Sequence, residues 1–191
     1  FELAEQIPLP REAVALRAEE KPEQCTISVA PGKLAEVKKA VLEDFVIDEH
    51  AVDLILSTLV YACKNILLIG KPGTGKTSIA RFIAEKLGFE PVIVTANAHW
   101  SRLDVIGGPM FTSRGGVTWR PGILVEALTR HVRAKKEGRS GAWLIIDEIN
   151  RADVDKAFGE FFTVFSGPEP REWVIPRRLF DEWESYAGSE D

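Results

Sequence analysis

Apolar residues along this chain fall into two patterns, helical spacing and short continuous runs. Apolar side chains recur every three or four positions over residues 34–45 and again, after Asp48, over residues 54–60. These stretches predict two amphipathic helices, the second capped by the Asp48 carboxylate. Other runs are short and apolar on both faces, as strands in a buried parallel sheet are. The strands predicted from them are residues 66–69, 91–95 and 143–146.

Further helices are predicted between and after these strands. One begins at Lys76 and stops near Leu87, where Gly88 ends it, and another covers residues 122–136 and ends in basic residues. Asp153 is placed to cap one more helix. Its apolar stripe is Val154, Phe158, Phe161, Phe162 and Phe165. The order strand, helix, strand predicts an α/β fold with three layers, an αβα sandwich around a parallel sheet.

Residues 96–121 differ from the rest because they are rich in Gly and Pro. Two β-prone trios, 110–112 and 117–119, flank a Gly-Gly turn, which predicts a β-hairpin. Basic and aromatic residues make the end of this hairpin a candidate surface for a partner. They are Arg114, Trp119 and Arg120.

The two ends of the chain carry weaker patterns. Residues 1–33 hold several prolines and a charged run, which is typical of a linker or of the edge of a preceding domain. Residues 173–175 are β-prone, residues 177–186 predict one more helix, and residues 188–191 form a polar tail. Because the chain begins at Phe1 and not at Met, we expect a fragment, a processed product or the ordered part of something longer.

Composition narrows the class of protein. With 191 residues, 45% of them hydrophobic and 28% charged, the chain suits one soluble globular domain. No apolar run has the length of a membrane span, and no signal-peptide pattern opens the chain. Two cysteines support neither a disulfide framework nor a zinc site, so we expect a cytoplasmic protein. The net charge of −5 argues against broad nucleic-acid binding.

Residues 70–77, GKPGTGKT, fit the phosphate-binding loop G-x-x-x-x-G-K-[ST]. A triphosphate concentrates negative charge, and a loop without side-chain bulk lets backbone N–H groups and a helix N-terminus face it. Lys76 supplies a point charge to the outer phosphates, and the Thr77 hydroxyl suits Mg²⁺. The residues predicted to bind the cofactor here are Gly70, Pro72, Gly73, Thr74, Gly75, Lys76, Thr77 and Ser78. The alternative is an ordinary Gly-Pro loop between a strand and a helix.

An acidic pair, Asp147-Glu148, follows the last of the predicted strands. Ligands of open α/β sheets lie outside the carboxyl ends of the strands, so we expect the phosphate loop and this pair to converge on one crevice. Asp147 is then placed to hold Mg²⁺ together with Thr77, and Glu148 to orient and polarise the attacking water. The alternative is an acidic pair that only caps the next helix.

These motifs together resemble a known family. GKPGTGKT followed by LIIDEINRAD looks like the AAA+ ATPases, which have the P-loop NTPase fold. IDEINRAD, with the preceding DVIGG and WRPGILVEAL, is similar to the branch with the MoxR proteins, McrB and the dynein-related ATPases. That branch carries a β-hairpin insert, which here would be residues 109–121. The resemblance runs over about residues 33–176, so the predicted domains are a linker (1–33), an incomplete nucleotide-binding core (34–187) and the tail (188–191).

The resemblance implies roles for single residues. Residues 73–78 would contact phosphates, Asp147 would lie at Mg²⁺, and Glu148, with Lys76, would be catalytic. Val46 and Ile47 match the place where such ATPases often seat the adenine, although an apolar helix end explains them equally well. Other polar residues are candidates to sense the nucleotide or to face a neighbouring subunit, or else to form local hydrogen bonds. They are Asn97, Asn150 and Arg151.

The chain also departs from the family pattern. A member goes on to a fourth strand with a polar sensor residue, an arginine finger and a small helical lid, and none of these is found here. Arg177-Arg178 is better interpreted as a basic surface pair than as a finger. The family therefore implies a homo-oligomeric ring, a hexamer, whose neighbours supply the missing arginine.

The predicted function is Mg²⁺-dependent binding and hydrolysis of a nucleotide, driving the remodelling of a protein or nucleic-acid partner in a ring. The alternative is a switch or assembly module that binds nucleotide without turnover. A P-loop kinase is a weaker third hypothesis, because no second acceptor site is visible. The absence of an N-K-x-D guanine signature favours ATP, with GTP still possible.

Overall fold

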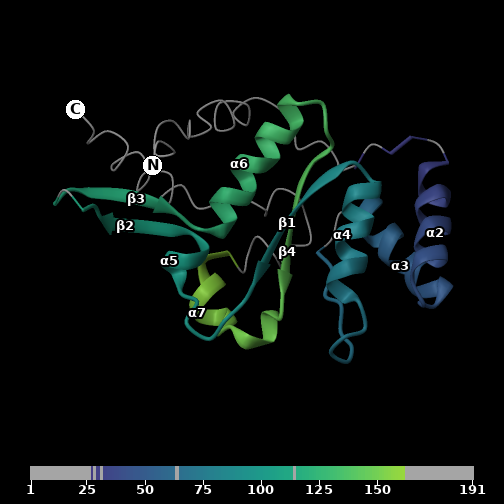
Figure 1. Ribbon diagram of the computed structural model, residues 1–191, viewed down its shortest axis with the longest axis horizontal. Helices are drawn as coiled ribbons and strands as arrows, with labels where there is room; N and C mark the ends of the chain where they lie inside the picture. The colour runs from purple at the N-terminus through teal and green to yellow at the C-terminus, as the bar shows by residue number, and fades with distance from the viewer. Residues whose placement is uncertain (1–26, 28, 31, 63–64, 114, 162–191) are drawn as a thin grey trace. The chain divides into compact units, whose positions relative to one another are not determined.

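The computed structural model describes residues 27, 29–30, 32–62, 65–113 and 115–161 (Figure 1). The chain divides into two compact units. The first contains residues up to Val92 together with Thr129–Ile145, and the second contains Ile93–Leu128 and the residues from Ile146 onward. Each unit has a hydrophobic core of its own.

Three helices build most of the first unit: α2 (Lys33–Asp44), α3 (Glu49–Val60) and α4 (Lys76–Lys86). Helix α2 packs against both α3 and α4. The Asp48 carboxylate accepts a hydrogen bond from the Ala51 N–H at 3.1 Å, which confirms the predicted cap of α3. All three helices lie where the apolar spacing predicted them.

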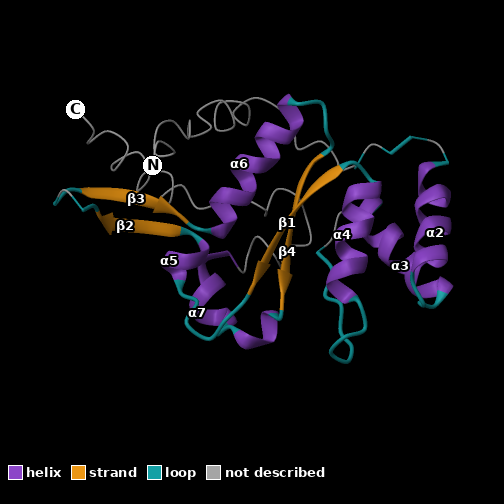
Figure 2. Ribbon diagram, viewed as in Figure 1, coloured by secondary structure: helices purple, strands orange, loops and turns teal. Residues whose placement is uncertain are grey.

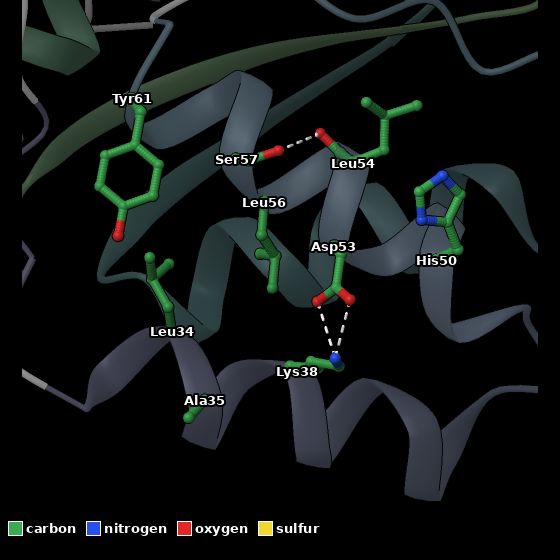
Figure 3. Close-up of a pocket in the computed structure, with 9 residues that line it drawn as sticks. All are labelled: Leu34, Ala35, Lys38, His50, Asp53, Leu54, Leu56, Ser57 and Tyr61. Carbon is green, nitrogen blue, oxygen red and sulfur yellow. Dashed lines mark hydrogen bonds and ion pairs between the residues drawn. The ribbon is translucent and has the colours of Figure 1, made fainter.

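A groove runs between α2 and α3 (Figure 3). Its apolar lining includes Leu34, Leu56 and Tyr61. Lys38 also lines it, and its Nζ lies 2.8 Å from carboxylate oxygens of both Asp53 and Glu49. Hydrogen bonds to Asp53 and then to Glu49 raise the pKa of the Lys38 ammonium. These pairs link the two helices across their exposed edge.

The core of the first unit lies between the helices and the start of the sheet. Its aromatic rings meet in pairs: Phe45 contacts Phe82 edge-on with centroids 5.3 Å apart, and Phe89 stacks on Trp143 at 4.7 Å. Such pairs add a geometric preference to the burial of area. The fully buried members of this core are aliphatic residues on the helices and Phe89. They are Val37, Val41, Val52, Leu56, Val60, Ile79, Ile83, Ala84, Leu87 and Phe89.

Strand β1 (Phe89–Thr95) pairs with strand β4 (Gly141–Asp147), although some fifty residues separate them in the sequence (Figure 2). The Ser140 N–H donates to the Gly88 carbonyl at 3.0 Å, and the Ala96 N–H donates to the Asp147 carbonyl at 2.9 Å. From the first of these bonds to the second, the residue numbers rise along both strands, so the strands are parallel. This confirms two predicted strands and a mixed α/β fold, whereas the three-layer sandwich stays a prediction.

The predicted strand over residues 66–69 is wrong for the structure as described. These residues form no strand, and Leu67 and Ile69 are 65% and 88% exposed. A strand exists only where a neighbour completes its ladder of hydrogen bonds. Within the described residues, β1 and β4 pair only with each other. Residues 66–69 therefore have the composition of a buried strand, but no neighbouring strand forms hydrogen bonds with them.

A β-hairpin stands out in the second unit (Figure 2). Strand β2 (Gly107–Phe111) pairs antiparallel with β3 (Val117–Pro121), and Phe111 lies opposite Val117. The Thr112 N–H and hydroxyl both donate to the Gly116 carbonyl and close the turn. The predicted hairpin is confirmed, with its first strand beginning at Gly107.

Short helices pack beneath the hairpin and form the core of the second unit. Helix α5 (Arg102–Val105) contacts α7 (Val154–Phe158), and a 3₁₀ turn, η2 (Gly159–Phe161), follows. Trp100 and Phe158 meet in this core with ring centroids 6.1 Å apart. Helix α7 begins at its predicted cap, where the Asp153 carboxylate accepts from the Lys156 N–H. Helix α6 (Ile123–Lys136) also lies where it was predicted.

Several predictions concern residues outside the described ranges. They are the linker over 1–26, the apolar positions Phe162 and Phe165, residues 173–175, the helix over 177–186 with Arg177-Arg178, the tail and Arg114. Among the helices that the structure describes, none is long and apolar enough to cross a bilayer.

Gly107 is expected to tolerate no side chain. Its φ is 119°, and a Cβ there would overlap the Trp119 ring and the Arg120 carbonyl oxygen. We expect Gly107→Ala to lower the free energy of unfolding by about 3 kcal/mol or more, measured by urea titration. Gly115→Ala is the matched control, because Gly115 has φ 83° but open space around it. The control should lose only about 1 kcal/mol, and equal losses would contradict the packing argument.

Candidate functional site

The loop at residues 70–77 takes a conformation that depends on its glycines. Gly73 and Gly75 have φ of 75° and 79°, the left-handed region that only glycine adopts at little cost. Gly75 is also the residue before α4, and it caps the helix without a side chain. The chain therefore turns from an extended segment directly into a helix whose N-terminal N–H groups have no partners within the helix.

Hydrogen bonds within the loop hold it closed. The Lys76 Nζ donates to the carbonyls of Gly70 and Lys71, at 3.0 and 2.8 Å. The Thr74 hydroxyl donates to the same Lys71 carbonyl at 2.9 Å. The ammonium thus turns back over the loop, on the side from which Gly70 and Lys71 present their carbonyls.

The donor set of this loop fits a phosphate group. Helix α4 has no acidic residue in its first turn, so the positive end of its dipole and the Lys76 ammonium act together. Pro72 and Ser78 are exposed on the loop and on the first turn of the helix, and Thr77 is half-buried beside Lys76. An anion with several oxygens would find N–H groups, an ammonium and hydroxyls within one turn of chain.

The two residues proposed for the adenine differ in their surroundings. Ile47 packs against the core of the first unit, whereas Val46 is fully exposed. The structure thus leaves one apolar side chain in solvent near the start of α3 and uses the other for packing. An adenine contact at Val46 and Ile47 stays a prediction.

The acidic pair lies at the end of β4. Asp147 is the last residue of the strand, and its carboxylate accepts a hydrogen bond from the Glu148 N–H at 3.1 Å. Glu148 has φ 52° and ψ 40°, and it is the one non-glycine with positive φ among the described residues. A 3₁₀ turn, η1 (Ile149–Arg151), follows, and the Arg151 N–H donates to the Glu148 carbonyl at 2.9 Å. Glu148 is exposed, so its carboxylate is presented to solvent from a strained and tightly bonded turn.

Asn97 is brought next to this pair. The bond from the Ala96 N–H to the Asp147 carbonyl places the ends of β1 and β4 side by side, and Asn97 comes directly after Ala96. The Asn97 side chain accepts a hydrogen bond from the His99 N–H at 2.9 Å, which fixes the turn after β1. Asn97 was a candidate from the sequence, but the sequence contained no reason to place it beside Asp147. The pairing of β1 with β4 gives that reason.

The predicted metal ligands belong to different units. Thr77 lies in the first unit and Asp147 in the second, and the same holds for Lys76 and Glu148. Convergence of these residues on one crevice therefore stays a prediction. No group of three or more His, Cys, Asp or Glu residues gathers as a metal site in the described part of the chain. Mg²⁺ needs no such group, because it usually binds one or two side chains and takes its remaining ligands from phosphates and water.

One histidine has a structural role. The His131 Nδ1 lies 3.1 Å from the Ala142 nitrogen, whose N–H donates to it, and ties α6 to the start of β4. A Cβ on Gly141 would overlap the His131 ring. His131 is therefore a packing residue.

The conformation of Glu148 leads to a test of stored strain. Replacing a non-glycine in the left-handed region by glycine removes a steric cost of about 1 kcal/mol. We expect Glu148→Gly to raise the free energy of unfolding by up to about that amount, measured in urea. Lys39→Gly, at an exposed position of α2, is the control and should lose about 1 kcal/mol. A loss of stability in Glu148→Gly would contradict the strain.

Comparison with known proteins agrees with these features. The chain is 34% identical over 142 residues to the Type IV methyl-directed restriction enzyme EcoKMcrB subunit of Escherichia coli (strain K12), an alignment that covers 71% of this chain and 30% of that protein. Midasin of Dictyostelium discoideum is 34% identical over 92 residues, which are 47% of this chain and 1% of midasin. The Lon protease of Mesomycoplasma hyopneumoniae (strain 232) is 34% identical over 90 residues, 47% of this chain and 9% of that protein. The chain thus spans less than a third of each of these relatives.

The family match covers both halves of the candidate site. The AAA domain of the dynein-related subfamily matches residues 65–178, a range that begins just before the phosphate loop and includes the hairpin and the acidic pair. This range is more than half of the chain. The chain therefore belongs to the AAA domains of the dynein-related subfamily, a family of ATPase domains with the P-loop fold.

Proposed function

We propose that this chain binds ATP with Mg²⁺ and hydrolyses it, and that hydrolysis in a ring of copies drives the remodelling of a protein or nucleic-acid partner. The phosphate loop carries the proposal. Its left-handed Gly73 and Gly75 lead into α4, and the Lys76 ammonium lies over the loop. Membership of the AAA domains supports nucleotide binding, and the relatives include a restriction enzyme subunit and a protease, which act on different kinds of macromolecule.

The residues of the loop would bind and orient the triphosphate. Residues 73–78 would offer N–H groups and hydroxyls to the phosphate oxygens. The Lys76 ammonium would break its hydrogen bonds to the carbonyls of Gly70 and Lys71 and would bind the outer phosphates instead. Thr77 and Asp147 would hold Mg²⁺, which, when bound, neutralises phosphate charge.

Glu148 would act on the attacking water. Its carboxylate is exposed at the end of β4, and its backbone is fixed by bonds to Asp147 and Arg151. A carboxylate held in this way can orient a water molecule and accept its proton as the oxygen attacks the terminal phosphorus. Asn97, which follows the Ala96 residue bonded to Asp147, would help to orient the same water molecule.

The Glu148→Gln variant distinguishes an ATPase from a nucleotide-binding switch. We expect wild type to release phosphate in a Mg²⁺-dependent way and the variant to be slower by about 10²–10⁴-fold, because it lacks the general base. Both proteins should bind a fluorescent ATP analogue with similar affinity. Wild type that binds nucleotide yet releases no phosphate at high protein concentration would favour the switch. Absence of nucleotide binding would refute both functions.

Lys76→Ala tests the loop itself. The variant removes the ammonium that faces the outer phosphates, so we expect nucleotide affinity to fall at least tenfold, measured by titration calorimetry. Lys71→Ala is the matched control, because Lys71 is exposed in the same loop and contributes only its backbone carbonyl to the bonds described above. Equal losses in the two variants would mean that the loop attracts phosphate by general charge alone.

A further inference from the structure

A run of basic residues covers the end of α6 and the loop that leads to β4. Five of the ten residues from 130 to 139 are Arg or Lys and one is Glu, in a chain whose net charge is −5. Arg133 and residues 135–139 are exposed, and the whole run belongs to the first unit. Positive charge is therefore concentrated on one short stretch of an acidic chain.

Three of these cations lie in a row along α6. Arg130, Arg133 and Lys136 follow one another at intervals of three residues, so they are neighbours on the helix surface. With a rise of about 1.5 Å per residue, the row is about 9 Å long. Arg139 extends it, because the Glu137 carboxylate lies 3.7 Å from the guanidinium groups of both Arg133 and Arg139. We call Arg130, Arg133, Lys136 and Arg139 the basic row.

Glu90, on β1, helps to hold the basic row in place. Its carboxylate oxygens lie 3.5 Å from guanidinium nitrogens of Arg130 and Arg139. These contacts are longer than the 2.8 Å that separates Lys38 from its two carboxylates in the same unit. Charge-assisted hydrogen bonds are strongest at about 2.7–2.9 Å, so Glu90 and Glu137 position the arginines through weak contacts.

The surroundings of the basic row select among anionic partners. From Thr129 to Ile145, no described residue is a large apolar side chain that is exposed. The centre of a protein–protein interface is depleted of charged residues and enriched in aromatic ones, and helices that lie on membranes bury an apolar face. Proteins that bind single-stranded nucleic acid stack its bases on aromatic rings. The phosphate backbone of a duplex needs only cations and hydrogen-bond donors, because its bases are already stacked.

The length of the basic row matches this backbone. Phosphates along one strand of duplex DNA are spaced about 3.4 Å apart along the axis, so about 9 Å of row spans roughly three of them. A guanidinium can also bind two oxygens of one phosphate at once. Double-stranded RNA is recognised partly through its 2′-hydroxyl groups, and a row made of cations alone has no acceptor for them. Duplex DNA therefore fits the row better than duplex RNA.

We propose that the basic row binds the phosphate backbone of double-stranded DNA without preference for sequence. The identification of this duplex as the partner that is remodelled rests on the proposed function, whereas the binding itself does not. Because the chain as a whole is acidic, binding is weak and depends strongly on salt. With roughly three phosphates neutralised, the affinity should fall about 40-fold between about 50 and 200 mM NaCl.

The first test compares two double variants of the whole chain. Arg133→Ala with Lys136→Ala removes two cations of the row and leaves a good helix former at each position. Lys39→Ala with Arg81→Ala is the matched control, because it also removes one Lys and one Arg, each exposed on a helix of the first unit and near a Glu four residues on. Binding to a labelled DNA duplex of about 20 base pairs is followed by fluorescence anisotropy.

We expect the variant in the basic row to bind this duplex at least tenfold more weakly than wild type at about 50 mM NaCl. Its plot of log affinity against log salt should be shallower by about 2, since two phosphate contacts are lost. The control should stay within about twofold of wild type. Equal losses in the two double variants, or no binding by wild type at this salt concentration, would overturn the proposal.

The second test raises the affinity, which a folding defect cannot do. Glu137→Gln removes the carboxylate that lies between Arg133 and Arg139. We expect it to bind the duplex about threefold more tightly, the effect of removing one like charge at about 6 Å in water. Glu43→Gln, at an exposed position of α2, is the control and should keep wild-type affinity. Unchanged or weaker binding by Glu137→Gln would count against the row.

Competition identifies the partner. Unlabelled duplex DNA, single-stranded DNA, duplex RNA, poly-glutamate and vesicles of phosphatidylserine are each added at the same concentration of negative charge. We expect duplex DNA to displace the labelled duplex best. A stronger effect of any other competitor would overturn the choice of double-stranded DNA.

These measurements also separate failure of this proposal from failure of the proposed function. Binding of the duplex is measured without nucleotide, and phosphate release from ATP is measured on the same preparations. Hydrolysis without binding of the duplex would overturn the role of the basic row and leave the ATPase standing. Binding of the duplex without hydrolysis would support the basic row and refute the ATPase.

Discussion

The parallel pairing of β1 with β4 is the constraint on which the proposed chemistry depends. It brings together chain segments some fifty residues apart, and its last bond joins Ala96 to Asp147. Because parallel strands end at the same edge, Asn97 and the acidic pair leave the sheet side by side. Without that pairing, the acidic pair would have no fixed relation to Asn97.

The phosphate loop and the acidic pair both contain backbone conformations that most residues avoid. In the phosphate loop the cost is small, because Gly73 and Gly75 occupy the left-handed region. At Glu148 the side chain is retained although glycine would fit the backbone better. A residue that keeps its carboxylate at such a cost, next to a strand end, suits a role in chemistry more than a role in stability. The bonds to Asp147 and Arg151 hold it there.

Much of the local structure was predictable because it depends on neighbours in the sequence. The Asp48 and Asp153 caps, the stop of α4 near Gly88 and the Gly-Gly hairpin turn all follow from side chains within a few residues. Helix α5 was missed, because its capping box of Ser101 and Asp104 lies in a stretch rich in Gly and Pro and covers a single turn. Residues 66–69 were wrongly predicted to be a strand. Their apolar composition indicates a tendency to be buried, but it does not show whether a neighbouring strand is present to pair with them.

The sequence by itself determined the phosphate loop, the acidic pair and membership of the AAA domains, since each depends on residue types at fixed short spacings. It also determined where most helices begin, because caps and apolar periods are local. Only the tertiary structure decided that β1 and β4 are partners and that Asn97 lies beside Asp147. The reason is that hydrogen bonds between distant segments, and the strain they can hold, are properties of the packed chain and leave no pattern in adjacent residues.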